Sequence, residues 1–250
     1  MKCTERLMCH HRGAEIQYRK VHACCLNINA KVFEKHDPVR FVEKLAKRKG
    51  KVNTGALQPH QVLMQVLDTS SSFHQAIAQA QWPALLAHVR LAGFWSNCIA
   101  VCDVSGSMSA PAAPNASLMD IAIAMSLLLA QVADGPLARH VITFHRTPQL
   151  VKLPETDDLV LLYQFFKKME WGSSTNFHKV FDLSKSASPP PRQVFVFSDM
   201  YFASAGGNET VLRKVQKEYN KLGLELPELV FWNLASSIGH LHWPTILGSC

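Results

Sequence analysis

The chain has 250 residues, of which 48% are hydrophobic and 18% are charged, an ordinary balance for a globular protein. Its first segment, MKCTERLMCHHRG, has no apolar core, which excludes a secretory signal. Its longest apolar run, IAIAMSLLLA, is about half of the roughly 20 residues that a membrane span needs. Of the seven cysteines, Cys98 and Cys102 lie in an apolar run, where reduced cysteine packs as a small hydrophobe. Together these features predict an intracellular, cytoplasmic protein with reduced thiols and no membrane partner.

Charge is divided unevenly along the chain. Residues 1–96 contain 14 Lys and Arg against 6 Asp and Glu, a net charge of +8. Residues 97–250 contain 12 against 13, a net charge of −1. This asymmetry predicts two segments with different surfaces: a helical module over residues 1–96 and an α/β domain over residues 97–250.

The first segment has helical patterns. In residues 37–50, Asp37 suits an N-cap, Pro38 the first turn and Gly50 the stop, while apolar and basic residues occupy opposite arcs. We predict an amphipathic helix there, and a second helix over residues 71–93 that is interrupted at Pro83. The basic arc is a candidate for contacts to phosphates and consists of Arg40, Lys44, Lys47 and Arg48.

From residue 97 onward, short apolar runs alternate with helical patterns. Strands are predicted over residues 97–103, 140–145, 193–199 and 228–235, and helices over residues 117–134, 157–170 and 208–223. The runs are almost continuously apolar, which is typical of strands buried on both faces. This alternation predicts a Rossmann-like, mostly parallel sheet flanked by helices.

Oxygen-bearing side chains gather where predicted strands end. DVSGS follows the first strand, a polar loop occupies residues 171–177, and a later strand ends in an aspartate. Ligands of open α/β sheets bind at the carboxyl ends of the strands. Hydroxyls and carboxylates without histidine or thiolate suit a hard cation, Mg²⁺ or Mn²⁺. The predicted ligands are Asp103, Ser105, Ser107, Thr175 and Asp199.

The mixture of donors also predicts how such a site behaves. Alternate spacing lets one turn aim Asp103, Ser105 and Ser107 into the same space, with Gly106 permitting the backbone. Hydroxyls are neutral, so the ion keeps most of its positive charge if the aspartates act through water. We therefore expect a non-enzymatic domain that binds a protein partner through a carboxylate of that partner.

These residues, in this order, resemble the metal-ion-dependent adhesion site of von Willebrand factor type A domains, over about residues 97–235. The resemblance implies that Ser105 and Ser107 ligate the metal directly and that Thr175 is a direct or state-dependent ligand. It also implies that Asp103 and Asp199 act mainly through water.

A wider set of motifs is similar to a family of plant and large-DNA-virus proteins of unknown function that contain a type A domain. These motifs include EIQYRKVHACCLNINAKVFEKHDPVRFVEKL, QPHQVL, IAVCDVSGSM, WGSSTNF, VFSDMYF and VFWNL. The N-terminal part resembles the helical, TROVE-like module of the Ro ribonucleoprotein autoantigen. The resemblance implies RNA binding by the basic helical module as the alternative function. It also implies that this module is partial and that the type A domain lacks its last strand and helix.

Other chemistries fit the sequence less well. DVSGS resembles the DxDGS loop of haloacid-dehalogenase-type phosphatases, but Ser105 stands where that chemistry needs a second carboxylate. The sequence has no G-x-S-x-G elbow and no recognisable nucleophile–base pair, so we expect no enzyme activity. Zinc is a weaker hypothesis, because paired ligand spacings are missing from Cys3, Cys9, His10, His11, His22, Cys24 and Cys25.

Overall fold

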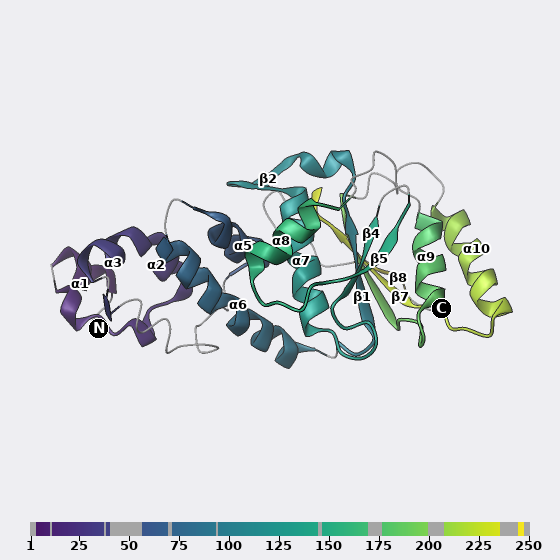
Figure 1. The fold of residues 1–250 in the computed structure, drawn as a ribbon, viewed down its shortest axis with the longest axis horizontal. Coiled ribbons are helices and arrows are strands. Elements are labelled where there is room, and N and C mark those ends of the chain that lie inside the picture. Colours follow the sequence, from purple (N-terminus) through teal and green to yellow (C-terminus); the bar gives the residue numbers. More distant parts are fainter. Residues whose placement is uncertain are drawn as a thin grey trace. The chain divides into compact units, whose positions relative to one another are not determined.

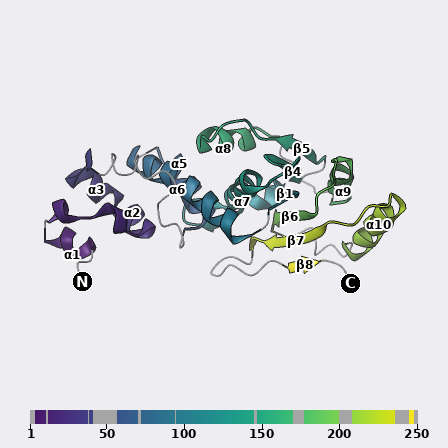
Figure 2. The same ribbon diagram turned by 90° about the horizontal axis from the view of Figure 1, so that it is seen from below.

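The computed structural model describes residues 4–10, 12–37, 39–40, 57–69, 72–93, 95–144, 147–169, 177–199, 208–235 and 245–247. By its internal contacts the chain divides into two compact units, residues 1–93 with 158–160 and residues 94–157 with 161–250. The first unit is helical, whereas the second contains a sheet with helices (Figures 1 and 2).

The helices of the first unit are α1 (Thr4–Cys9), α2 (Ala23–Ile28), α3 (Ala30–His36), α5 (Pro59–Leu67) and α6 (Ser72–Ala92). The side chains of Leu26, Leu63 and Ile77 are fully buried among them. Asp37, the predicted N-cap, is the C-cap of α3, and Val39 and Arg40 are helical. Pro38 and residues 41–50 lie outside the described residues.

Helix α6 continues through Pro83, so the predicted interruption is wrong. A proline inside a helix removes one backbone hydrogen bond and costs about 3 kcal/mol. Pro83 itself is exposed, whereas its neighbours Gln81, Trp82, Ala84 and Leu85 are buried. Burial of these neighbours offsets the missing hydrogen bond, so packing overrides the local preference of proline.

A six-stranded sheet in the order β5-β4-β1-β6-β7-β8 forms the centre of the second unit (Figure 1). The four inner strands are parallel: β1 (Cys98–Asp103), β4 (His140–Phe144), β6 (Gln193–Ser198) and β7 (Glu228–Asn233). The edge strands β5 (Gln149–Lys152) and β8 (Thr245–Leu247) pair antiparallel with β4 and β7. The inner strands are the four predicted ones, and the predicted mostly parallel α/β fold is confirmed.

Helices cover both faces of this sheet. Figure 1 shows α7 (Leu118–Val132) and α8 (Leu159–Lys167) on one side, with α9 (Phe177–Ser186) and α10 (Asn208–Lys221) on the other. Helix α7 is buried on nearly every face, as its sequence predicts. Among the described residues, no helix combines the length and apolar character that crossing a membrane requires.

Strand β1 is buried along its whole length because helices cover both faces of the sheet, and successive side chains of the strand point to opposite faces. Ile99 and Val101 belong to the hydrophobic core that also includes residues of α9 and α10. The intervening Cys98, Ala100 and Cys102 are small and fully buried, which leaves room for α7 to pack closely on β1. A rigid central strand therefore ends at Asp103.

Candidate metal centre

Strand β1 ends in the carboxylate of Asp103, which is only 1% exposed. One residue further, the N–H of Val104 still donates to the carbonyl of Phe144 in β4 (3.3 Å). The chain then turns into the short 3-10 helix η3 (Gly106–Ser109), which the fully buried side chain of Met108 anchors. The turn that presents Ser105 and Ser107 is therefore held at both ends.

Both carboxylate oxygens of Asp103 accept hydrogen bonds. Oδ1 accepts from the backbone N–H of Ser105 (2.9 Å), and Oδ2 accepts from the hydroxyl of Ser198 (2.5 Å). Ser198 is the last residue of β6, which lies parallel to β1 with Phe197 opposite Cys102. The two bonds fix the orientation of this carboxylate at the edge of the sheet.

Asp199 follows Ser198 directly and is 6% exposed, so a second carboxylate is buried at the same edge. Burial raises the pKa of Asp103, hydrogen bonds from Ser198 and Ser105 oppose this rise, and the charge of Asp199 adds to it. A bound cation would relieve both the burial penalty and the repulsion between the two carboxylates. Ser198 is not among the ligands predicted from the sequence, and its position beside Asp199 is the signal that could have pointed to it.

The hydroxyl oxygens of Ser105 and Ser107 lie 3.2 Å apart. Neighbouring ligands of an octahedral Mg²⁺ lie about 2.9 Å apart, since each is about 2.0–2.1 Å from the ion. The serine pair is therefore close to the spacing that two ligands of one ion require. Ser105 is buried and Ser107 is exposed, so the pair leads from the floor of the site to the surface.

The structure thus brings four of the five predicted ligands to the carboxyl ends of the neighbouring strands β1 and β6. These four are Asp103, Ser105, Ser107 and Asp199. Their donor set fits a hard cation, and their role as ligands stays a prediction. Thr175 lies outside the described residues.

The turn itself does not require glycine at position 106. The described glycines with left-handed backbone are Gly135 and Gly223, and Gly106 is not among them. A Cβ atom added to Gly106 would meet no atom within 4 Å. The expectation that Gly106 permits the backbone is therefore wrong, because an L-residue would fit the same conformation and space.

Of the predicted basic arc, the structure describes only Arg40; Lys44, Lys47 and Arg48 lie outside the described residues. Arg40 donates from Nη2 to the carbonyl of Ile16 (3.3 Å) and pairs through Nη1 with Oδ2 of Asp37 (3.2 Å). Its guanidinium also lies over the ring of Tyr18. Arg40 is therefore engaged within the helical unit while its side chain stays 37% exposed.

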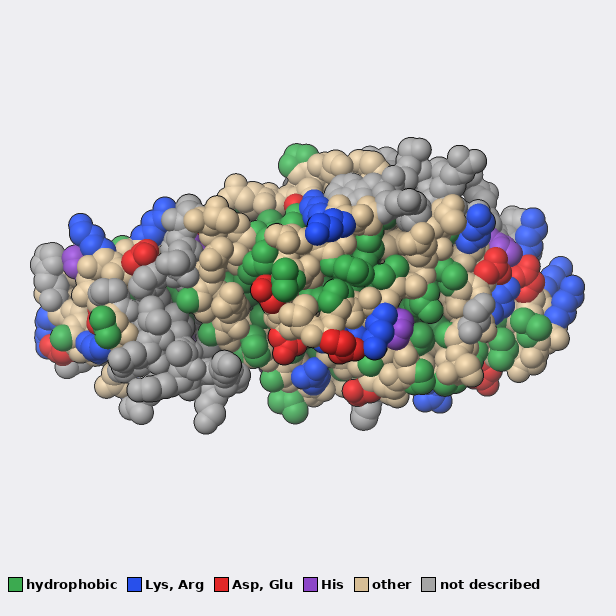
Figure 3. All heavy atoms as spheres, viewed as in Figure 1, with side chains coloured by type: hydrophobic (Ala, Val, Ile, Leu, Met, Phe, Trp, Pro, Cys, Tyr) green, Lys and Arg blue, Asp and Glu red, His purple; other side chains and the backbone are tan. Residues whose placement is uncertain are grey.

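A second group of titratable side chains lies where α9 meets α10. Nε2 of His178 lies 3.1 Å from Oε1 of Glu218, and Nδ1 lies 3.5 Å from Oδ2 of Asp182. Nζ of Lys185 lies 2.9 Å from Asp182 and 2.7 Å from Glu218, and its hydrogen bond lowers the pKa of Glu218. Because Lys185 already pairs with both carboxylates, we interpret this group as an ion-pair network between the helices. Figure 3 shows acidic, basic and histidine side chains gathered over this end of the molecule.

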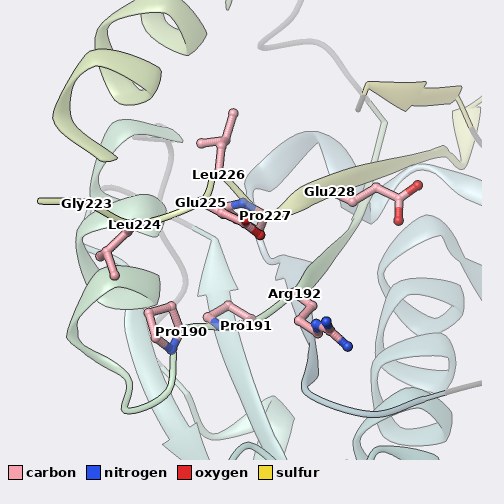
Figure 4. Close-up of a pocket in the computed structure, with 9 residues that line it drawn as sticks. All are labelled: Pro190, Pro191, Arg192, Gly223, Leu224, Glu225, Leu226, Pro227 and Glu228. Carbon is pink, nitrogen blue, oxygen red and sulfur yellow. The ribbon is translucent and has the colours of Figure 1, made fainter. Parts of the chain in front are cut away.

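A cavity of about 390 Å³ lies at the opposite, amino edge of the sheet (Figure 4). Residues 190–192 and 223–228 line it, just before β6 and β7 begin. Its charged side chains are Arg192, Glu225 and Glu228, of which Glu228 accepts a hydrogen bond from Gln193 (2.7 Å). The lining has no histidine, cysteine or serine, so this cavity does not compete with the candidate metal centre as a chemical site.

The described residues form an α/β domain with a mostly parallel sheet, and a helical unit comes before it in the sequence. Residues 97–245 match the family described as domain of unknown function DUF7788. Residues 1–94 match the family described as domain of unknown function DUF2828. The chain belongs to the DUF7788 family, whose model covers more than half of it.

Individual proteins are also similar to this chain. The uncharacterized protein L728 of Acanthamoeba polyphaga mimivirus is 35% identical over 208 residues, which cover 79% of this chain and 35% of that protein. The crystal structure of the Ro (RSR) protein of Deinococcus radiodurans has a TM-score of 0.59 at 15% identity, covering 94% of this chain and 50% of that one. This chain therefore spans about a third of the first relative and about half of the second. At this identity, the structural likeness shows the fold alone.

Proposed function

We propose that this chain is a non-enzymatic binding module that holds Mg²⁺ at the carboxyl edge of its sheet and captures a carboxylate of a protein partner. One observation carries the proposal. The buried carboxylate of Asp103, held by two hydrogen bonds, lies close enough to Asp199 for the two charges to repel, beside the paired hydroxyls of Ser105 and Ser107. Buried like charges cost free energy unless a positive partner offsets them.

Each donor has a distinct part in this proposal. Ser105, Ser107 and Thr175 would offer hydroxyl oxygens directly to the ion. Both oxygens of Asp103 already accept a hydrogen bond, and their remaining lone pairs suit contacts through water, as do those of Asp199. Mg²⁺, when bound, supplies a positive centre with coordination positions that three hydroxyls do not fill.

The described part of the site also supports binding over catalysis. It offers carboxylates and hydroxyls but no histidine or lysine that could serve as a general base for a nucleophile. A carboxylate donated by a partner would instead complete the coordination shell without any bond being broken.

Thermal unfolding with and without Mg²⁺ tests the proposal. Ligand at about 100 times its Kd stabilises a protein by about 2.7 kcal/mol, which raises Tm by about 5–10 °C for a domain of this size. Asp199→Asn should remove this increment while the protein still folds. Asp157→Asn is the matched control, because the Asp157 side chain is 100% exposed, and it should keep the increment.

A second variant and the outcome that would contradict the proposal complete this test. Thr175→Ala should weaken the Mg²⁺ response and leave Tm in EDTA nearly unchanged. An Asp199→Asn protein that responds to Mg²⁺ as the wild type does would show that the proposed centre is wrong.

A second candidate function is an RNA-binding component whose helical unit contacts the nucleic acid. The net charge of +8 over residues 1–96 favours it, as does the fold shared with the Ro protein. Neutralising phosphates releases counterions, so such binding should weaken steeply as salt rises and should ignore EDTA. Filter binding of a structured RNA over a salt series, with and without EDTA, separates the two functions. Binding that does not change with salt would exclude this candidate.

A further inference from the structure

The segment that leaves the candidate metal centre is uncharged. In a chain with 18% charged residues, no Asp, Glu, Lys or Arg occurs between Asp103 and Asp120. The segment forms η3 and the two short strands β2 (Pro111–Ala113) and β3 (Ala116–Ser117), which pair antiparallel as a hairpin. Figure 1 shows β2 at the same edge of the molecule as the carboxyl ends of the inner strands.

Much of this segment faces solvent with small side chains. Ser107, Ser109, Ala110 and Pro111 are exposed, and Ala112 and Ala113 are half-buried. We call residues 107–113 the neutral platform. It begins at the predicted metal ligand Ser107 and therefore adjoins the candidate metal centre along the chain.

The hairpin that contains the end of the platform is held rigidly. Its turn has Asn115 in the left-handed conformation (φ 62°), and Ala116 is buried. The N–H of Leu118 donates to the carbonyl of Ala110 (3.0 Å), and Ser117 caps α7 in a reciprocal pair of bonds with Asp120. A surface that is already ordered loses little entropy when a partner docks on it.

The chemistry of the platform selects among classes of partner. A nucleic-acid backbone needs Lys or Arg beside it, and this segment has neither. A polyacidic segment would likewise find no further cation there. Small apolar side chains can instead bury the neighbouring apolar residues of an extended protein segment. Residues 200–207, MYFASAGG, which follow Asp199, are also uncharged.

We propose that the neutral platform is a docking surface beside the metal centre, which selects protein segments whose acidic residue is flanked by small apolar side chains. This inference rests on the proposed function, because the ion must first hold the carboxylate. The neutral platform then contacts the residues on either side of that carboxylate and so discriminates between carboxylate-bearing segments.

Three short peptides test this choice on the Mg²⁺-loaded wild-type protein. The first is acetyl-Ala-Val-Asp-Val-Ala-amide; the second has Asn in place of Asp, and the third has Lys in place of both Val. Alanine-methyl NMR spectra should show shifts at Ala112 and Ala113 with the first peptide and none with the second. The third should bind on the order of fivefold more weakly, the factor expected from about 1 kcal/mol of lost apolar burial. Equal affinity for the first and third peptides would overturn the inference.

A variant of the platform gives an independent result. Ala112→Glu should weaken the first peptide on the order of tenfold while the Mg²⁺-induced rise of Tm stays that of the wild type. Ala87→Glu, on the exposed face of α6, is the matched control and should change neither. An unchanged peptide affinity in Ala112→Glu, with the Mg²⁺ response intact, contradicts the platform but not the proposed function. A wild type that does not respond to Mg²⁺ contradicts the proposed function itself. If Ala112→Glu does not fold, the peptide series on the wild type still decides.

Discussion

Ser198 and Asp103 are 95 positions apart in the sequence, yet their side chains share a hydrogen bond at the edge of the sheet. That bond and the one from the Ser105 N–H leave Asp103 a single orientation. The orientation of the predicted ligand Asp103 therefore depends on Ser198 of β6, which is not itself a predicted ligand.

Ser198→Ala removes this hydrogen-bond donor from a buried carboxylate. We expect a loss of about 1–3 kcal/mol in the free energy of unfolding, together with a smaller Mg²⁺ increment because Asp103 can then rotate. Urea denaturation with and without Mg²⁺ measures both effects. Ser184→Ala is the control: Ser184 is also buried but bonds to the Val180 carbonyl within α9, and its loss should leave the Mg²⁺ increment unchanged. An unaltered increment in Ser198→Ala would show that this bond does not position Asp103.

The sequence was sufficient to place Asp103, Ser105 and Asp199 at strand ends, because apolar runs and their polar boundaries are local patterns. The partner of Asp103 could not be predicted in the same way. It depends on the register between β1 and β6, and a shift by one residue would turn Ser198 to the other face of the sheet. The tolerance of the turn for a side chain at Gly106 likewise depends on surrounding space, which the sequence does not show.

At the scale of elements, Asp120 joins the start of α7 to α8. Its carboxylate accepts from the N–H and hydroxyl of Ser117 (2.9 and 2.7 Å) and from the hydroxyl of Tyr163 (2.7 Å), and Lys167 lies 3.4 Å away. Burial alone would raise the pKa of Asp120, but these bonds and the lysine charge lower it below its ordinary value of 3.8. The ionised form is therefore the one that stabilises the folded state.

Asp120→Asn should cost about 1–2 kcal/mol at neutral pH, the usual loss for a cap with additional buried bonds. Because the pKa of Asp120 is lowered on folding, its contribution is complete above 3.8 and is lost as pH falls through the lowered value. Urea denaturation of wild type and variant, from pH 7 down to about pH 3, should show the difference shrinking. A difference in the free energy of unfolding that stays constant over this range would contradict the role of the ionised carboxylate. The control Asp157→Asn should have the same free energy of unfolding as the wild type.

Pro83 is a second feature at this scale. The proline is exposed within α6, so Pro83→Ala would restore a backbone donor without disturbing a buried side chain. We expect a gain of about 1–3 kcal/mol in the stability of the helical unit, measured by urea denaturation followed by circular dichroism. A loss of stability would instead mean that packing of Trp82 and Leu85 requires the local bend that proline favours.

The inner strands and α7 could be predicted because they are almost continuously apolar, and α8 and α10 because apolar residues recur in them at helical spacing. Helix α9 was missed because its buried face is short and includes a polar residue. Val180 and Phe181 are buried there next to Ser184, whose hydroxyl is satisfied by the carbonyl of Val180. At Pro83 a helix break was predicted and is absent, because the packing of the neighbouring residues overrides the local preference of proline.

At the scale of the whole molecule, the two segments differ in charge as well as in fold, with +8 over residues 1–96 and −1 over residues 97–250. The two candidate functions therefore belong to different parts of the chain. The Mg²⁺-dependent one depends on the sheet, and the RNA-dependent one depends on the helical unit.

Reversing the basic arc tests the second of these alone. The variant with Arg40, Lys44, Lys47 and Arg48 all changed to Glu should lose RNA binding, since favourable phosphate contacts become repulsive. Its Mg²⁺-induced rise of Tm should stay that of the wild type. The engagement of Arg40 with Asp37 means that an otherwise identical variant retaining Arg40 is the proper control for folding. RNA binding equal to that of the wild type would show that these four residues do not contact RNA.

The burial of β1 has a consequence for how this molecule can be observed. Cys98 and Cys102 are both fully buried in that strand, and burial raises the pKa of their thiols to about 11 and about 12. The thiolate is the form that attacks alkylating reagents, so burial and the raised pKa protect both positions while the sheet is folded. The rate of alkylation at these two cysteines therefore reports how often the central strand β1 becomes exposed by local or global unfolding. The native sequence thus provides this probe without any engineered cysteine.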